Sequence, residues 1–285
     1  MMKTKRINFL YYPVYLAAVF SIGLMSCSTS EPLNNPTTSA TLWVQNAAEY
    51  QALTTMVYRS AGDNLNTLLE IDAPTASLEQ TDADFENLPP AIILDVDETV
   101  LDNSPFQARL IKQGETYSTQ KWNRWVREEK ADAIAGAVDF TKKAAQKGFT
   151  IFYLTNREAA VEEATFNNLQ KMGFPLKEGV DVLLTKNEQS NWTSAKVNRR
   201  KHVAKNYRIV MLFGDNLNDF IPAKDITNEQ RLALVKKHEN RFGTQWYVLP
   251  NPVYGSWEQA LYDFDDSLSP KEIKQTKLER FETKN

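Results

Sequence analysis

The feature that most constrains this chain is a series of short, almost uninterrupted apolar runs. Strands buried on both faces have this continuous pattern, whereas strands with one wet face alternate apolar and polar residues. Segments with helical spacing separate the runs, and this alternation predicts an α/β fold in which helices flank a parallel sheet. The predicted strands are residues 91–94, 149–154, 180–184, 209–213 and 245–249.

The segments between the runs have the spacing of helices. The predicted helices are one or two in 41–70, two in 121–147, and one each near 157–172, 193–206 and 227–241. We expect the helix at 157–172 to begin with a capping box formed by Thr155 and Glu158 and to end at Gly173. Prolines and several acidic residues indicate that 73–90 is a linker.

The N-terminus has the layout of a secretory signal. Lys3, Lys5 and Arg6 precede a mostly apolar, uncharged stretch at 9–25. The sequence LMSC, which ends at Cys27, resembles a bacterial lipobox, in which the cysteine is acylated and becomes the new N-terminus. The alternatives are a plain signal peptide, or an uncleaved anchor helix beside an uninvolved cysteine.

These residues predict a lipid-anchored protein. Residues 1–26 are the predicted lipoprotein signal peptide, and 27–40 form a tether rich in Ser, Thr, Pro and Asn. Acyl chains such as palmitate on Cys27 would hold the protein on a membrane. The expected place is the bacterial cell envelope, at the outer membrane and facing the periplasm or the exterior. No later segment of the sequence is long and apolar enough to span a bilayer.

Composition excludes several classes of site. A single cysteine allows no intrachain disulfide and no multi-cysteine zinc site, and two histidines argue against a His-rich metal site. A net charge of -3 gives no overall attraction to a nucleic acid polymer, so none is expected as a partner. We expect His202 and His238, which lie in charged helical stretches, to be surface residues with no ligand role.

Acidic side chains collect at the ends of two predicted strands. Residues 91–94 run into Asp95 and Asp97, and residues 209–213 are followed by Asp215 and Asp219. Ligands of open α/β sheets bind outside the carboxyl ends of strands, so these carboxylates are expected in one crevice. A bound cation would relieve their repulsion, and all-oxygen ligands favour Mg2+.

The order of these motifs resembles that of a known superfamily. DVDET, the TNR step, a lysine before the fourth strand and GDNLND resemble the four motifs of the haloacid dehalogenase superfamily. Within it, IILDVDETVLDNSPF and IVMLFGDNLNDF resemble the paired signatures of class C acid phosphatases, bacterial lipoproteins also called nonspecific acid phosphatases. The similarity runs from about Leu94 to Trp257.

The resemblance implies a Rossmann-like haloacid dehalogenase fold, a parallel sheet flanked by helices with a small, mainly helical cap. The implied domains are a helical or cap segment with its linker at 41–90, a catalytic domain at 91–265 and a polar C-terminal tail at 266–285. The cap insertion is expected at about 106–135.

The resemblance also implies catalytic roles. Asp95 matches the nucleophile that forms an aspartyl-phosphate, and Asp97 matches the general acid-base. Residues i and i+2 of extended backbone point to one side, so both carboxylates can face one pocket. Thr155 matches the hydroxyl that holds phosphate, helped by the backbone N–H of Asn156. If it is not catalytic, Thr155 is expected to be only a helix N-cap.

Three further polar residues have implied roles. Asp215 matches the Mg2+ ligand, beside the Asp95 carboxylate and the Asp97 backbone carbonyl. Lys196 matches the cation that neutralises phosphate and nucleophile, although Lys186, Lys201 and Lys205 are alternatives nearby. Asp219 is expected to orient Lys196 or a metal-bound water, or else to cap the next helix.

Aromatic residues are candidates for the substrate pocket. Their position in the family favours Phe106, Trp125 and Tyr254 for stacking on an aromatic leaving group, which contributes about 1–3 kcal/mol per stacked base. For Trp122, stacking and core packing are equally favoured. The family usually has tyrosine where this chain has Phe106, so the ring is kept and the hydroxyl is lost.

The sequence therefore predicts a Mg2+-dependent acid phosphatase. It would hydrolyse small phosphomonoesters, such as nucleoside monophosphates and aromatic phosphates, through an aspartyl-phosphate. A noncatalytic lipoprotein that binds haem or another ligand, and a phosphotransferase of the same superfamily, are the alternatives. A homodimer is left open as an assembly state.

Overall fold

A computed structural model describes residues 35–70, 74–80 and 84–284. Its centre is a five-stranded, fully parallel sheet with the strand order β5-β4-β1-β6-β7. The strands are β1 (Pro90–Leu94), β4 (Thr150–Glu158), β5 (Leu183–Lys186), β6 (Arg208–Gly214) and β7 (Trp246–Val248). The predicted fold class is confirmed, and β1 lies in the middle of the sheet, between β4 and β6.

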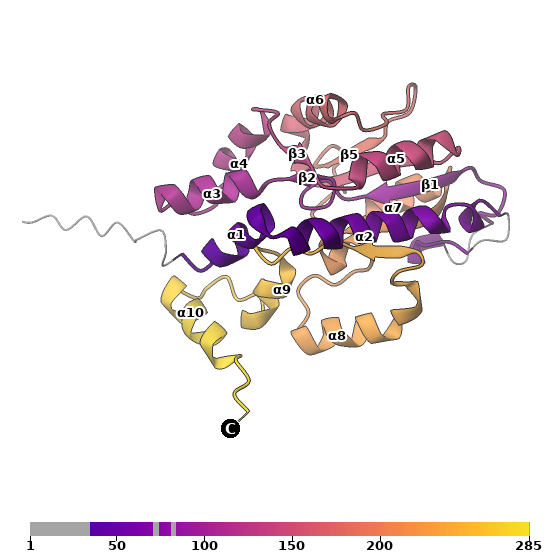
Figure 1. The fold of residues 1–285 in the computed structure, drawn as a ribbon. Coiled ribbons are helices and arrows are strands. Elements are labelled where there is room, and N and C mark those ends of the chain that lie inside the picture. The colour runs from indigo at the N-terminus through magenta and orange to yellow at the C-terminus, as the bar shows by residue number, and fades with distance from the viewer. Residues whose placement is uncertain (1–34, 71–73, 81–83, 285) are drawn as a thin grey trace, which may run out of the picture.

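Helices cover both faces of this sheet, which explains why the strand sequences do not alternate (Figure 1). In β1, Ile92 and Leu94 pack into one apolar cluster, and Ala91 and Ile93 pack into the other. The first cluster includes residues of α2 (Ala48–Asn64), α5 (Ala137–Gln146) and α6 (Glu162–Met172). The second includes residues of α7 (Val197–Ala204) and α8 (Asn228–Lys237).

The segment between β1 and α5 forms a small layer of its own beside the sheet. It contains α3 (Ser104–Gln113), α4 (Thr119–Val126) and a two-stranded antiparallel sheet of β2 (Leu101–Asp102) and β3 (Asp132–Ala133). We refer to residues 101–133 as the cap. Helix α1 (Thr38–Asn46) packs against α3, as Figure 1 shows. Helix α2, which the sequence grouped with a cap segment, instead packs on the sheet.

The predicted end of β4 and the predicted starts of α6 and β5 were wrong. Strand β4 continues through Glu158, a short 3-10 turn covers Ala159–Val161, and α6 begins only at Glu162. Thr155 is therefore inside a strand, and no capping box forms with Glu158. The third strand begins at Leu183 rather than at residue 180.

The predicted linker at 73–90 contains a packed segment. Ala76 is fully buried, and its backbone N–H donates to the Ile209 carbonyl at 2.7 Å. The Gln80 side chain donates to the Ala204 and Tyr207 carbonyls at 3.0 and 2.7 Å. Residues 74–80 thus extend the fold along α7 and β6.

The two ends of the chain complete the description. The predicted signal peptide, Cys27 and most of the predicted tether lie outside the described residues, and α1 already begins at Thr38. Near the C-terminus, α9 (Ser256–Gln259) is followed by α10 (Pro270–Glu279), so the predicted polar tail contains a helix. Within the described residues, every helix is too short or too polar to cross a membrane.

Candidate active site

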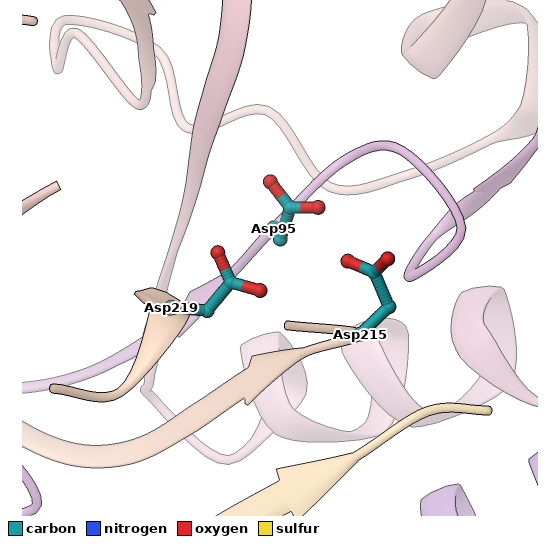
Figure 2. A group of neighbouring side chains, drawn as sticks. All are labelled: Asp95, Asp215 and Asp219. Atoms are coloured by element: carbon teal, nitrogen blue, oxygen red, sulfur yellow. The ribbon is translucent and has the colours of Figure 1, made fainter. Parts of the chain in front are cut away.

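A cavity of about 750 Å³ lies at the carboxyl ends of the sheet strands. Asp95 directly follows β1, Asp215 directly follows β6, and Asp219 ends the short 3-10 helix Leu217–Asp219. Figure 2 shows the three carboxylates pointing toward one another. The cavity lining includes Asp95, Asp97, Gln107, Tyr117, Trp122, Asn156, Lys196, Asp215, Asn216, Asp219, Ile221, Pro222, Ala223 and Tyr254.

Lys196 is the lysine that the structure brings to this cluster. Its buried Nζ contacts Asp95 Oδ1 and lies 2.7 Å from Asp219 Oδ1. Burial disfavours the charged ammonium, but the carboxylates of Asp219 and Asp95 outweigh it and raise the pKa of Lys196. Lys186, one of the alternatives, instead lies 3.5 Å from Glu158.

Asp219 has both of its oxygens in use. Oδ1 accepts from Lys196, and Oδ2 accepts from the backbone N–H of Asn216 at 3.0 Å, as part of a capping box. Its side chain packs so tightly on Gly214 that a Cβ there would overlap with it, so glycine is required at the end of β6. Asp219 therefore caps its 3-10 turn and orients Lys196 at the same time.

Asp95 and Asp215 each have one carboxylate oxygen that accepts no hydrogen bond from the described residues. Among the described residues, Asp95 Oδ1 is taken by Lys196 and Asp215 Oδ2 accepts from Asn251 at 2.7 Å, while the second oxygen of each carboxylate accepts no hydrogen bond. One carboxylate oxygen from each of Asp95, Asp215 and Asp219 lies within 4.8 Å of the other two. Carboxylate oxygens are hard ligands, and oxygens at this spacing fit a shared divalent cation.

The electrostatics of the cluster also favour a cation. Burial, joined by repulsion from Asp219 and Asp97, raises the pKa of Asp95 to about 7 despite the ammonium of Lys196. Burial and the neighbouring carboxylates of Asp219 and Asp95 raise the pKa of Asp215 well above its ordinary value. A bound dication would supply the positive charge that these ionised carboxylates lack.

Asn251 was not identified from the sequence as a site residue. Its side-chain Nδ2 donates to Asp215, and its Oδ1 accepts from the backbone N–H groups of Val253 and Tyr254 at 3.0 and 3.4 Å. The C-terminal loop therefore fixes the orientation of a candidate metal ligand. An asparagine between two prolines, Pro250 and Pro252, is the only signal that the sequence offered.

Asp97 is held from two sides. Arg157 Nε and Nη2 lie 2.9 and 2.8 Å from Asp97 Oδ1, and Asn103 Nδ2 donates to the same oxygen at 2.9 Å. The Thr155 hydroxyl is 3.3 Å from the other oxygen, Oδ2. The sequence placed Arg157 within the TNR step without giving it a role, and it did not identify Asn103.

The end of β4 is organised by Arg199, a further residue that was not identified from the sequence. Its guanidinium contacts the Thr155 carbonyl, and Nη2 donates to Asn156 Oδ1 and the Thr193 carbonyl at 2.7 and 2.8 Å. Burial lowers the pKa of Arg199 to about 10, so the group remains a cation at neutral pH. Asn156 lines the cavity from extended backbone, and not from a helix N-terminus as expected.

The aromatic residues are placed differently from the expectation. Phe106 and Trp125 are each 3% exposed and are not part of the cavity lining, so their placement argues against contact with substrate. Tyr117 and Trp122 line the cavity instead. Tyr254 also lines it, and its hydroxyl donates to the buried carboxylate of Glu98.

The two histidines do not contribute to the cavity. His202 packs edge-on against Trp192, and His238 packs against Trp246 on the sheet edge. Neither lines the cavity. The apolar environment and the nearby Lys237 and Arg241 lower the pKa of His238.

The central strand of this parallel sheet leads into a DxD pair, and a lysine before α7 and two aspartates after β6 lie beside that pair. This arrangement defines a protein of the haloacid dehalogenase type. Residues 21–257 match the model of the HAD superfamily, subfamily IIIB (acid phosphatase), and the chain belongs to this family.

Solved structures agree with this assignment. The chain is 32% identical to the class C acid phosphatase from Bacillus anthracis, with a TM-score of 0.76 over 89% of this chain and all of that one. A second structure of that enzyme, with tungstate bound, gives 32% identity and a TM-score of 0.77 over 90% of this chain and all of that one.

Two plant proteins are more distant relatives. The chain is 28% identical to acid phosphatase 1 of Solanum lycopersicum over 163 residues, which are 57% of each chain. It is 26% identical to the stem 31 kDa glycoprotein of Glycine max over 57% of this chain and 58% of that one. The chain thus spans little more than half the length of these two relatives.

Proposed function

We propose that this protein is a Mg2+-dependent acid phosphatase that hydrolyses small phosphomonoesters through a phosphorylated Asp95. The observation that carries the proposal is the convergence of Asp95, Lys196, Asp215 and Asp219 in one cavity. Phosphoryl transfer requires a nucleophile, a fixed cation, and free carboxylate oxygens that can hold a dication.

In the first half of the reaction, Asp95 attacks phosphorus and the ester oxygen leaves. Asp97 gives its proton to that oxygen, and in the second half it takes a proton from the water that hydrolyses the aspartyl-phosphate. Water then releases inorganic phosphate and restores the Asp95 carboxylate.

Lys196 keeps Asp95 in place and offsets negative charge on the phosphoryl oxygens. Asp219 also accepts from Lys196, so the ammonium stays beside the proposed nucleophile. The Asn156 side chain supplies a neutral hydrogen-bond donor at the end of β4, whereas the buried Thr155 hydroxyl donates to Asp97 and does not line the cavity. These groups are set before substrate arrives, which is the condition under which electrostatic stabilisation is most effective.

Asp95 and Asp215 would hold Mg2+, with the Asp97 backbone carbonyl as a further oxygen ligand. The chemistry that the ion supplies there is neutralisation of charge on the transferring phosphoryl group. The related class C acid phosphatase from Bacillus anthracis was solved with tungstate bound. Tungstate is a tetrahedral oxyanion like phosphate, which supports the proposal that this chain also binds a phosphate-like oxyanion.

The cavity walls suggest an aromatic leaving group. Tyr117 and Trp122 lie on the cap side, and Ile221 and Pro222 form an apolar wall from the loop after β6. A nucleoside or phenyl ring would bury its faces against these side chains. We therefore propose nucleoside monophosphates and aryl phosphates as substrates.

We also propose that Cys27 carries the lipid anchor in the bacterial envelope. The signal-like N-terminus and its single cysteine support this. Mass spectrometry of the membrane fraction should find an acylated N-terminal peptide beginning at Cys27. A soluble protein without acyl chains, or an intact N-terminus, would contradict the proposal.

The function is tested with a panel of phosphate esters. The purified protein should hydrolyse p-nitrophenyl phosphate and a nucleoside monophosphate, lose activity in EDTA and regain it with Mg2+. It should not cleave the diester bis(p-nitrophenyl) phosphate. Asp95→Asn should abolish turnover, whereas Asp225→Asn, which changes an exposed carboxylate, should leave it unchanged. Full activity of Asp95→Asn would contradict the proposal, and preferential transfer to an added alcohol would indicate a phosphotransferase.

A further inference from the structure

Asp97 has very unequal surroundings at its two carboxylate oxygens. Oδ1 receives Nε and Nη2 of Arg157 at 2.9 and 2.8 Å, and Nδ2 of Asn103 at 2.9 Å. Among the described residues, Oδ2 has only the Thr155 hydroxyl, at the longer distance of 3.3 Å. The side chain is 18% exposed, and it lines the cavity. Oδ2 is thus the oxygen that remains available to a leaving group.

Arg157 is fixed in turn by buried partners. It is 1% exposed, although it lies beside a solvent-accessible cavity. Nη1 donates to the Thr165 hydroxyl at 3.3 Å, and Nη2 donates to Asn103 Oδ1 at 3.2 Å. The face of Trp122 lies 5.6 Å from the guanidinium carbon. A guanidinium with this many fixed contacts has little freedom to rotate, so it defines where Asp97 Oδ1 must lie.

Asn103, a residue of the cap, connects the carboxylate of Asp97 to helix α4. It is fully buried at the start of α3, and its Oδ1 accepts from Trp125 Nε1 at 2.8 Å. Because Trp125 Nε1 and Arg157 can only donate, the facing atom of Asn103 is its oxygen, and Nδ2 is left for Asp97. The chain of contacts therefore runs from α4 through Asn103 to Asp97.

We propose that Arg157 and Asn103 are positioning residues that hold Asp97 by Oδ1 and aim Oδ2 at the leaving-group oxygen, with Trp125 locking Asn103 from the cap. This inference rests on the proposed function, in which Asp97 protonates the leaving group. It gives Trp125 a supporting role in the chemistry in place of substrate stacking.

The dependence of rate on the leaving group distinguishes this role from a purely structural one. Phenyl phosphate and p-nitrophenyl phosphate share one ring and therefore one binding site. The phenolate of phenyl phosphate is the more basic and needs a proton to leave, whereas p-nitrophenolate leaves readily without one. A misplaced general acid must slow the first substrate much more than the second.

The experiment measures kcat/KM for both substrates in Arg157→Met, Asn103→Ser and Trp125→Phe, with Asp97→Asn as the benchmark. General acid catalysis contributes about 10²–10⁴-fold, so Arg157→Met should lose about tenfold or more on phenyl phosphate beyond its loss on p-nitrophenyl phosphate. Trp125→Phe, which removes only one donor, should show a smaller shift in the same direction. Arg157→Lys should recover part of the selectivity.

Arg208→Met is the matched control. Arg208 is also a buried arginine, but it begins β6 at the opposite end of the sheet, where Nη1 donates to the Glu70 carbonyl at 2.6 Å. Its loss should affect both substrates equally. Should Arg157→Met not fold, the milder Trp125→Phe and Asn103→Ser variants decide the question.

Two results would overturn the inference, and they are distinguishable. Equal losses on both substrates in the folded variants would show that Arg157 and Asn103 only support the structure, while the proposed function stands. A wild-type protein that hydrolyses neither substrate would refute the proposed function, and the inference would fall with it.

Discussion

Lys196 Nζ lies 2.7 Å from Asp219 Oδ1 and also contacts Asp95, so one buried ammonium is shared by two carboxylates. Asp95 lies in the loop after β1, Lys196 lies at the start of α7, and Asp219 lies in the turn after β6. Because Asp219 is also fixed by the backbone N–H of Asn216, the position of the cation is set independently of Asp95. This arrangement would hold the proposed nucleophile, Asp95, in place before substrate binds.

Replacing this ammonium should therefore damage catalysis more than binding. Lys196→Met removes the cation that faces the developing charge, and we expect kcat to fall about 10²–10³-fold. Lys186→Met is the control, since Lys186 forms a half-exposed pair with Glu158 and such pairs contribute about 0–1 kcal/mol. Steady-state kinetics on p-nitrophenyl phosphate measure both. A Lys196→Met enzyme within a few-fold of wild type would remove Lys196 from the mechanism.

Cation affinity should depend on pH. Burial raises the pKa of Asp95 to about 7, and burial also raises that of Asp215 well above its usual value. Both carboxyl groups must lose their protons before they bind Mg2+, so binding releases protons and weakens as the pH falls. Because two protons are released, we expect affinity to fall by up to about 100-fold for each pH unit below about 7. Calorimetric titration of metal-free protein at several pH values measures this, and a constant affinity between pH 5 and pH 8 would contradict it.

Asn251 should control metal affinity through Asp215. Removing a hydrogen-bond partner of a ligating carboxylate typically costs about 10–100-fold in metal affinity, and we expect this loss for Asn251→Ala. Asn240→Ala, on an exposed 3-10 turn, is the control and should bind Mg2+ like wild type. Thermal unfolding with increasing Mg2+ reports the affinity without any activity measurement. Identical Mg2+ responses of the two variants would refute the role of Asn251.

Asn156 should bind the phosphoryl group through its side-chain amide. Arg199 can only donate, so it fixes Asn156 Oδ1 and leaves the NH2 group of Asn156 for the cavity. A hydrogen bond to a charged group contributes about 1.5–3 kcal/mol, so Asn156→Ala should weaken inhibition by tungstate about tenfold or more. Asn198→Ala, an exposed asparagine of α7, should leave the inhibition constant unchanged. A normal constant for Asn156→Ala would show that this amide does not contact the oxyanion.

The buried pair of Glu79 and Arg200 should make stability depend on pH. Burial opposes the charge of Glu79, but the Arg200 guanidinium at 2.6 Å outweighs it and lowers the pKa below the ordinary 4.5. A carboxylate whose pKa is lower in the folded state than in the unfolded state stabilises the protein at pH values above the unfolded-state pKa. This stabilisation is lost as the pH falls through the folded-state pKa. Glu79→Gln should therefore lose about 3 kcal/mol at pH 7, typical of a broken buried pair, and less at pH 3, because this contribution declines as the pH falls below 4.5. Urea unfolding at both pH values measures the difference, and an equal loss at each would contradict it.

The sheet was predictable from the sequence because strands covered on both faces are continuously apolar. The end of β4 was not predictable, because Thr155 and Glu158 have the pattern of a capping box. Only tertiary contacts, such as Arg157 with Asp97 and Arg199 with the Thr155 carbonyl, keep these residues extended. The segment 74–80 looked like a linker because its sequence has no periodic pattern. Its place in the fold depends on tertiary contacts, such as the hydrogen bond from the Ala76 N–H to the Ile209 carbonyl of β6.

Within the site, the motifs placed the acidic residues but not the residues that hold them. Asp95 and Asp215 directly follow strand ends, so their meeting point follows from parallel topology, whereas Lys196 precedes α7 and was one of several candidate lysines. Asn103 and Asn251 lie in loops, where nothing in the sequence shows which carboxylate a side chain will reach. Trp125 was assigned to substrate because an aromatic ring alone does not reveal that its N–H is needed by Asn103.

The central claim is that Asp95 carries the phosphoryl group during turnover. The most direct test is an acid quench of the enzyme in the first turnover, followed by mass spectrometry of its peptides. We predict one phosphoryl group on Asp95, which hydroxylamine removes, and none in Asp95→Asn. Phosphate release during that turnover with an unmodified Asp95, or with the phosphoryl group on another residue, would contradict the account.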